Sequence, residues 1–175
     1  MPNYNSHLYL KETINSIINQ SYKSWELIIV DDNSDLKTIK ILKSFKNFKK
    51  IKIYFLKKNK GDGYCRIYGS KKSKSKFIAF IDSDDIWEKD KLKIQLNFMK
   101  KNKFNFTYTN YTPFKNKILL KEIKPPKKFN FYSFIKNTTI ATSSIMIQRE
   151  LLKSIKLCKS PNFEDYFLKC QILKK

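Results

Sequence analysis

Two mainly apolar runs that each end in acidic residues constrain the fold of this chain most. Residues 25–30 stop at Asp31-Asp32, and residues 77–81 stop at Asp82-Ser83-Asp84-Asp85. Short apolar runs with polar boundaries indicate buried strands. In open α/β sheets, ligands bind beyond the carboxyl ends of the strands. The sequence therefore predicts a sheet whose ligand-binding edge carries two groups of carboxylates.

The segments around these runs alternate between helical and strand patterns. Leu10, Ile14 and Ile17 recur at helical spacing, and Asn5 or Ser6 is expected to cap that helix. Further helices are predicted over residues 36–45, from the glycine-bearing stretch to residue 72, and around Leu92, Leu96 and Met99; further strands are predicted over 51–56 and 104–108. This order predicts an α/β fold, with a mostly parallel, Rossmann-like sheet flanked by helices on both faces.

The two ends of the chain are less regular. Residues 1–5 read as the end of a first strand whose apolar body is absent. Beyond residue 111, Pro125-Pro126 indicates a loop, 144–147 a strand, and 149–155 and 163–173 helices. The chain stops in or just after the last helix. We therefore expect one domain that is incomplete at both ends.

The strong positive charge admits several explanations. There are 37 basic residues against 15 acidic ones, and only Arg66 and Arg149 are arginine. Nucleic-acid binders draw on arginine for bidentate contacts, and no nucleic-acid-binding motif is present, so nucleic acid is not an expected partner. One explanation is a solvated lysine surface that reflects the codon usage of an AT-rich genome. The other is a surface that attracts anionic lipid or an anionic substrate.

Cysteine usage and hydropathy indicate the compartment. Cys65, Cys158 and Cys170 are odd in number and far apart, which favours free thiols in a reducing environment. The single histidine, His7, cannot form a metal site alone. No signal peptide and no apolar run of about 20 residues is found. A cytoplasmic protein is expected, with the inner face of the cell membrane as an alternative position.

The D-x-D pattern at Asp82 and Asp84 fits a divalent metal site. Carboxylates at a strand end can share Mn²⁺ or Mg²⁺ with the phosphates of a substrate. Taken alone the pattern is weak, because a solvated acidic turn has the same residues. Asp31 is ambiguous too, since it either accepts a hydrogen bond from a nucleobase or ribose or belongs to a strand-ending turn.

The motifs together resemble family 2 glycosyltransferases, which are inverting enzymes with the GT-A fold. The likeness is close over residues 1 to about 100 and looser beyond. It runs through Met1-Pro2-Asn3-Tyr4-Asn5, Asn19-Gln20-Ser21-Tyr22, residues 25–34, Asn59-Lys60-Gly61, Arg66, Gly69 and residues 77–87, with a weaker match at Phe163-Glu164-Asp165-Tyr166. The resemblance divides the chain into a nucleotide-sugar-binding portion, 1–110, and a partial acceptor-binding portion, 111–175.

The resemblance also implies roles for individual residues. Asp84 would be the main ligand of Mn²⁺ or Mg²⁺, and Asp82 would contact the metal or the ribose. Asp165 matches the general base. The remaining donor-binding positions would be Pro2 and Tyr4 in the nucleobase pocket, Asp31 on the base, and Arg66 near the donor.

Plainer explanations compete at several positions. Arg66 could pair with a surface acid, Glu164-Asp165 could be an acidic helix start, and Tyr4 and Trp87 could be core aromatics. The chain also departs from the family pattern: Cys65 precedes the arginine, Ile67 follows it, and residues 73–76 lack the usual glycine. No Q-x-x-R-W motif is present, so repeated polymerisation is not expected.

The resemblance implies an inverting transferase that moves a sugar from a nucleotide-diphosphate sugar, expected to be uridine-linked. The acceptor would be a glycan or lipid-linked hydroxyl in the synthesis of a cell-surface glycan, such as lipooligosaccharide or capsule. Two alternatives remain: a truncated, catalytically inactive fragment, and a basic module that binds nucleic acid or an anionic membrane. A nucleotidyltransferase is a further rival, but it would need a glycine-rich loop after the first strand, which Asn3–His7 does not provide.

Overall fold

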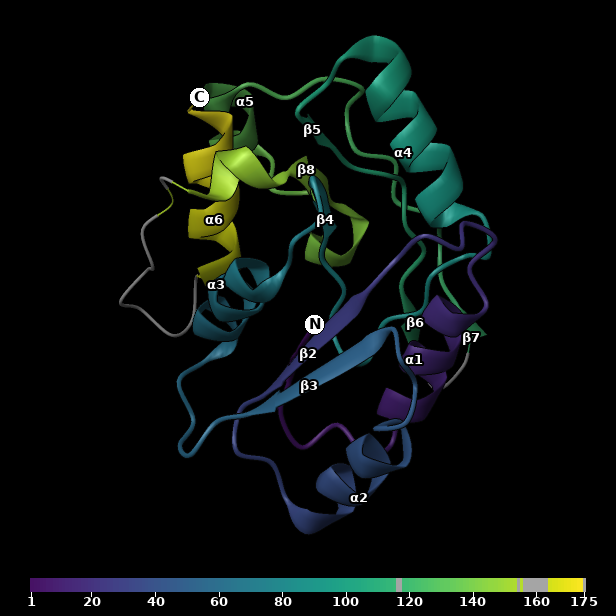
Figure 1. Ribbon diagram of the computed structural model, residues 1–175. Helices are drawn as coiled ribbons and strands as arrows, with labels where there is room; N and C mark the ends of the chain where they lie inside the picture. The colour runs from purple at the N-terminus through teal and green to yellow at the C-terminus, as the bar shows by residue number, and fades with distance from the viewer. Residues whose placement is uncertain (116–117, 154, 156–163, 175) are drawn as a thin grey trace.

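The computed structural model describes residues 1–115, 118–153, 155 and 164–174. Cys158 and Phe163, which the sequence singled out, lie outside this set. Two small sheets lie between helices, with α3 and α6 on one side and α1 and α4 on the other (Figure 1). No helix in the described ranges combines the length and apolarity needed to cross a membrane.

The first sheet is parallel and has the order β1-β2-β3. Its strands are β1 (Pro2–Asn3), β2 (Leu27–Asp31) and β3 (Ile51–Phe55). The central strand β2 is buried along its whole length. Leu27 and Ile29 pack into the core with α1 (Leu10–Ile18) and α2 (Leu36–Ser44), whereas Ile28 and Val30 pack toward α3 (Asp62–Lys72). Helices on both faces explain the continuous apolar run in β2.

The second sheet is antiparallel and has the order β4-β8-β5. It comprises β4 (Phe77–Ala79), β8 (Met146–Gln148) and β5 (Phe106–Thr107), and α4 (Lys91–Asn102) contacts β5. The central strand β8 comes from the last third of the chain, so the two portions predicted from the sequence share one sheet. Ile147 of β8 is fully buried between its neighbours.

The remaining elements come mainly from the last third of the chain. They are the hairpin of β6 (Phe114–Lys115) and β7 (Ile118–Leu119), α5 (Phe131–Lys136), the 3₁₀ turns η1 (Thr142–Ser144) and η2 (Arg149–Leu152), and α6 (Glu164–Leu173). Asn130 and Ser133 form a capping box that begins α5. Phe134 of α5 is fully buried against Leu168 and Ile172 of α6.

The predicted α/β fold is confirmed, with three local differences. The strands predicted at 77–81 and 104–108 correspond to β4 and β5. Each pairs antiparallel with β8, which lies between them. Ser6 does not cap α1 with its side chain; its backbone oxygen instead accepts hydrogen bonds from Tyr9 and Leu10. Among the described residues of the predicted 149–155 helix, only Arg149–Leu152 are helical, as a 3₁₀ turn.

The scarce glycines mark two close approaches of α3. A Cβ added at Gly69 would lie 3.2 Å from Val30 Cγ2, so glycine lets α3 pack tightly on β2. At the other end, a Cβ on Gly63 would lie 2.5 Å from Glu164 Cβ, and a Cβ on Gly61 would lie 2.7 Å from Glu164 Oε1. Gly61 also has φ of +83°, which favours glycine. The first turn of α6 therefore sits directly on the glycine-bearing loop.

A mainly apolar cavity of about 430 Å³ lies between the two sheets. Leu27 and Ile28 of β2 line one side, and residues 77–81 line the other. Neither Asp82 nor Asp84 contributes to its wall. A nucleotide diphosphate held through these carboxylates would thus bind outside this cavity.

Substituting Gly63→Ala tests the contact between α3 and α6. Helix propensity alone favours alanine over glycine by about 1 kcal/mol. The clash with Glu164 predicts the opposite sign, a loss of about 1–3 kcal/mol in the free energy of unfolding, which urea denaturation measures. In a double-mutant cycle, Glu164→Gly should remove this loss. A Gly63→Ala protein that is more stable than the parent would contradict the observed packing.

Candidate functional site

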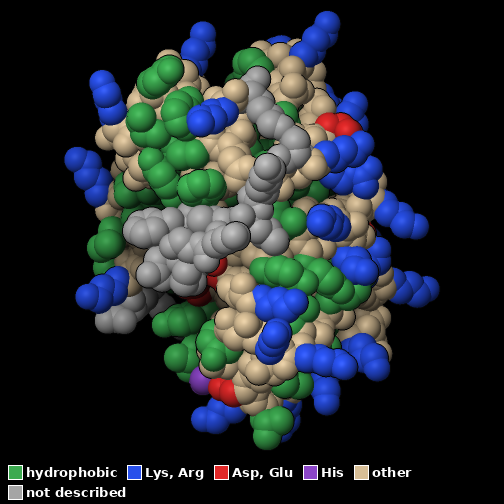
Figure 2. All heavy atoms as spheres, turned by 90° about the vertical axis from the view of Figure 1, so that its left-hand side faces the viewer, with side chains coloured by type: hydrophobic (Ala, Val, Ile, Leu, Met, Phe, Trp, Pro, Cys, Tyr) green, Lys and Arg blue, Asp and Glu red, His purple; other side chains and the backbone are tan. Residues whose placement is uncertain are grey.

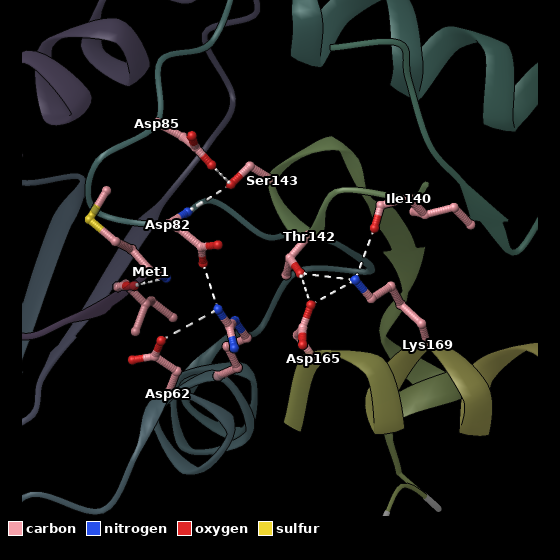
Figure 3. Close-up of polar contacts among 11 residues, drawn as sticks. Met1, Asp62, Asp82, Asp85, Ile140, Thr142, Ser143, Asp165 and Lys169 are labelled. Carbon is pink, nitrogen blue, oxygen red and sulfur yellow. Dashed lines mark hydrogen bonds and ion pairs between the residues drawn. The ribbon is translucent and has the colours of Figure 1, made fainter. Parts of the chain in front are cut away.

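The acidic turn after β4 is pinned to η1. The backbone N–H of Asp82 donates to Ser143 Oγ at 3.0 Å, and the Ser143 hydroxyl donates to the carboxylate of Asp85. Trp87 Nε1 donates to the backbone oxygen of Ser143 at 2.9 Å, and its side chain is buried. One serine thus fixes the conformation of the turn (Figure 3). Trp87 is a core aromatic, as the plainer explanation held.

Arg66 extends from α3 toward this turn. Its Nη2 lies 2.7 Å from Asp82 Oδ1 and 3.8 Å from Asp62 Oδ2. The arginine is only 6% exposed. A guanidinium at this depth requires an acidic partner, so this pair differs from a solvated surface ion pair. Because only Oδ1 of Asp82 contacts Arg66, the carboxylate keeps a second oxygen for another ligand.

Several carboxylates around Arg66 repel one another. Burial raises the pKa of Asp62, and the negative charges of Asp82, Asp32 and Asp84 add to the rise although Arg66 opposes it. Burial also raises the pKa of Asp85 despite its hydrogen bond from Ser143. A cation or a bound donor's metal would relieve this repulsion.

The donor set fits a hard divalent cation that also takes water and phosphate oxygens. Asp84 is exposed and Asp82 is half-buried, so both can reach a ligand from solvent. Within the described residues, no group of three or more His, Cys, Asp or Glu side chains is arranged around a common metal position. Mg²⁺ and Mn²⁺ commonly take one or two carboxylates and complete their coordination with water and phosphate oxygens. The two aspartates satisfy that requirement.

The carboxylates after β2 are buried and engaged. Asp31 accepts from Asn3 Nδ2 at 2.7 Å and from the Ser34 N–H at 3.1 Å. Asp32 accepts from the backbone N–H groups of Lys60 and Gly61, both at 2.8 Å. Asp31 therefore fixes Asn3 beside the end of β1, and Asp32 fixes the glycine-bearing loop. The sequence motif did not indicate which of the two performs which task.

The positions predicted for a nucleobase pocket lie at the end of β1. Pro2 is buried within that strand, whereas Tyr4 is 49% exposed. Tyr4 is therefore not a core aromatic, and its ring is open to a ligand. Asn5 has φ of +49° and its side-chain oxygen accepts from the Asp35 N–H, so the chain turns sharply just beyond Tyr4.

Cys65 is an inert neighbour of this site. It is buried beside Arg66 on α3 and forms no disulfide. Burial, together with the negative charges of Asp32 and Asp62, raises the pKa of Cys65 to about 12. The thiol therefore stays protonated near neutral pH and is a poor nucleophile.

Asp165 lies in the first turn of α6, on the other side of the site from Asp62 (Figure 3). Its Oδ2 lies 2.8 Å from Lys169 Nζ and accepts from Thr142 Oγ1 at 3.3 Å. Burial alone would raise the pKa of Asp165, but Lys169 and the backbone of Tyr166, with a smaller contribution from Arg66, lower it overall. The carboxylate is therefore ionised and able to accept a proton.

The structure thus brings together most of the residues singled out by the sequence. Asp82 and Arg66 are in contact, Asp84 is adjacent, and Asp165 is close enough for the Arg66 charge to affect its pKa. Tyr4 and Asp31 lie at the neighbouring sheet. Sequence reasoning missed most of the residues that hold these groups in place: Asp62, Thr142, Ser143 and Lys169. The run Thr142-Ser143-Ser144 before β8 was the only available signal.

Comparison with known proteins gives a consistent result. The model of the family "Glycosyl transferase family 2" matches residues 1–156. An uncharacterized glycosyltransferase of Haemophilus influenzae is 37% identical over 178 residues, covering 97% of this chain and 69% of that protein. The Escherichia coli UDP-Glc:alpha-D-GlcNAc-diphosphoundecaprenol beta-1,3-glucosyltransferase WfgD is 34% identical over 175 residues, covering 99% and 68%.

A solved structure supports the fold. S. aureus TarS 1-349 in complex with UDP-GlcNAc superposes with a TM-score of 0.80 at 23% identity, covering 98% of this chain and 51% of that chain. The chain therefore spans about half of the TarS structure and about two thirds of each of the two relatives. With its α/β architecture and the family match over most of its length, the chain belongs to glycosyltransferase family 2 and has the GT-A fold.

Proposed function

We propose that this chain binds a nucleotide-diphosphate sugar and transfers the sugar, with inversion, to an acceptor hydroxyl. The observation that carries the proposal is the contact of buried Arg66 with Asp82, beside exposed Asp84 and within electrostatic reach of Asp165. This arrangement offers a cation, two metal-binding carboxylates and an ionised base around one site. We keep residues 1–110 as the donor-binding portion and 111–175 as part of the acceptor-binding portion.

The donor is proposed to be uridine-linked. The name of WfgD includes UDP-Glc, and TarS has been solved in complex with UDP-GlcNAc. Tyr4 would contact the nucleobase from the end of β1, with Pro2 shaping the backbone there. Asp31 would serve the base pocket through the groups that it orders, Asn3 and Ser34.

The diphosphate is proposed to lie over the turn after β4. Asp84 would be the main ligand of Mn²⁺ or Mg²⁺, and Asp82 would use its second oxygen for the metal or the ribose. The bound metal would supply positive charge to stabilise the departing diphosphate. Arg66 fixes Asp82 for this role and adds a positive charge near the phosphates.

Asp165 is proposed to be the general base. Its carboxylate would take the proton from the acceptor hydroxyl while that oxygen forms a bond to the anomeric carbon. The bond from the anomeric carbon to the diphosphate oxygen breaks, and its electron pair leaves with the nucleotide diphosphate. Attack from the face opposite the diphosphate inverts the configuration. By analogy with the name of WfgD, the acceptor would be a lipid-linked sugar in the synthesis of a cell-surface glycan.

Replacing Asp84 with asparagine tests the metal assignment. The substitution removes a negative charge but keeps the shape, so UDP-sugar should lose most of its Mn²⁺-dependent stabilisation. Because ligand binding to the native state raises stability by mass action, thermal unfolding with UDP-Glc or UDP-GlcNAc, with and without Mn²⁺, measures the effect.

Asp90→Asn is the matched control, because Asp90 is an exposed aspartate that makes no capping bond on α4. It should leave the Mn²⁺ effect unchanged. An unaltered Mn²⁺ effect in Asp84→Asn would remove Asp84 from the metal site. Donor binding without any transfer by the parent chain would favour the inactive-fragment alternative.

We also propose that the protein works in the cytoplasm and rests on the inner face of the cell membrane. The face that carries α3, α5 and α6 has lysine and arginine side chains spread over it and few acidic ones, so charge alone singles out no surface there (Figure 2). The outer face of α4 differs, because Ile94 and Phe98, together with Phe104 just after the helix, are exposed by 66, 52 and 45%. The two phenylalanine rings also contact each other, with centroids 5.7 Å apart.

Exposed lysines lie close in sequence to these apolar side chains, with Lys93 and Lys101 on α4 and Lys103 just after it. An apolar stripe with basic residues beside it is typical of helices that lie in the interface of an anionic membrane. The apolar side chains would enter the interface while the lysines contact anionic headgroups. Nucleic acid would use the lysines but not the apolar stripe.

Flotation with vesicles that contain phosphatidylglycerol tests this surface. The double substitution Ile94→Asn and Phe98→Asn should lower vesicle binding about tenfold or more, since burying such side chains contributes roughly 1.5–3 kcal/mol each at full burial. Leu36→Asn, at an exposed leucine of α2, should have no effect. Equal binding by the parent and the double variant, or binding only to DNA, would exclude the α4 surface.

A further inference from the structure

Lys169 is a buried cation that the proposed mechanism has not used. It lies on α6, one turn after Asp165, and is only 5% exposed. Lysine is seldom buried unless its charge is paired. Its Nζ lies 2.8 Å from Asp165 Oδ2, 2.9 Å from the Ile140 backbone oxygen and 3.5 Å from Thr142 Oγ1. An ammonium group has three donors, and each has an acceptor here.

The pair with Asp165 is asymmetric in its exposure. The Lys169 side chain is 6% exposed and the Asp165 side chain is 44% exposed. Pairs of this i, i+4 spacing on helix surfaces contribute little, because both side chains are solvated and mobile. Here the cation is fixed inside the protein and the carboxylate faces the site. Lys169 therefore constrains Asp165 more than Asp165 constrains Lys169.

Both side-chain contacts of Asp165 fall on the same oxygen. Lys169 and Thr142 bind Oδ2, and the backbone of Tyr166 also donates a hydrogen bond to the carboxylate, whereas Oδ1 has no side-chain hydrogen bond within the described part of the chain. Thr142 is followed by Ser143, which fixes the backbone of Asp82. Two adjacent residues of η1 therefore hold the two parts of the site: Thr142 contacts Asp165, and Ser143 contacts the turn that carries Asp82 (Figure 3).

We propose that Lys169 is the positioning residue of the general base: it holds Oδ2 of Asp165, stabilises its negative charge and leaves Oδ1 for the acceptor hydroxyl. The inference rests on the proposed role of Asp165. Lys169 contacts neither donor nor acceptor, so it acts only through that carboxylate.

The positive charges near Asp165 determine how its ionisation should depend on pH. The charged groups that face Asp165 are Lys169 on its own helix and Arg66 on α3, and Arg66 is largely occupied by Asp82. Burial raises the pKa of Asp165, and Lys169 supplies the principal opposing effect. A lowered pKa keeps the base ionised to a lower pH. Without Lys169, the acid limb of the kcat/KM profile should therefore move to higher pH.

The first test is Lys169→Met, followed by NMR titration of the Asp165 side-chain carboxyl carbon. This readout needs no transferase activity. We expect the Asp165 pKa to rise by about one unit or more, as loss of a close opposite charge requires. Lys174→Met, which removes an exposed lysine directly after the same helix, should leave the titration unchanged. An unshifted Asp165 in folded Lys169→Met would overturn the proposal.

A second variant separates charge from hydrogen bonding and from folding. Lys169→Gln keeps donors for Ile140 and Asp165 but has no charge, so it should raise the Asp165 pKa even if Lys169→Met fails to fold. In transfer assays both folded variants should lose kcat about tenfold or more, with the loss greatest at low pH and with unchanged donor KM. Lys169→Arg should restore activity in part. A uniform loss of kcat at every pH with normal Asp165 titration would mean a merely structural lysine.

The two proposals can fail separately. If the parent chain binds UDP-sugar but transfers nothing, the proposed function fails while the NMR titration still decides whether Lys169 controls Asp165. If transfer occurs but depends on neither Asp165 nor Lys169, the base assignment fails while donor binding stands.

Discussion

The buried guanidinium of Arg66 connects the two sheets of this protein. Arg66 belongs to α3, which packs on β1 and β2, and its partner Asp82 follows β4 of the other sheet. Removing one partner of a buried ion pair leaves an uncompensated charge, which is far costlier than losing a surface pair. The contact therefore fixes the relative position of α3 and the acidic turn. The geometry of the site depends on this one interaction more than on any hydrophobic contact near it.

Cations divide the carboxylates of the site into two groups. Asp165 has Lys169 beside it, and its pKa is lowered in spite of burial. Asp62 and Asp85 lie among other acids, and their pKa values are raised, because burial and like charges outweigh Arg66 and Ser143. One group suits proton acceptance and the other suits attraction of a cation. Family 2 membership supplies the reaction type, while these local charges distribute the tasks among residues.

The sequence predicted the elements whose signal is local. The apolar run of β2, the heptad-like spacing around Leu92 and the glycines beside Arg66 each gave the correct element, because burial on one or both faces leaves a periodic pattern. The position of β8 between β4 and β5 left no such signal, since strand order depends on contacts distant in sequence. Lys169 was equally hidden, because nothing in the sequence distinguishes it from the other lysines; only the fold shows that it is buried. Asp82, Asp84 and Asp165 were identifiable from motif order, but their supports at Thr142 and Ser143 were not.

The close packing of α6 on the glycine-bearing loop couples the movements of these two segments. Gly61 and Gly63 leave no room between the loop and Glu164, which directly precedes Asp165. A displacement of this loop must therefore displace the first turn of α6, and Asp165 with it. Residues 61, 63 and 164 should accordingly change together among functional variants, as a single mechanical unit.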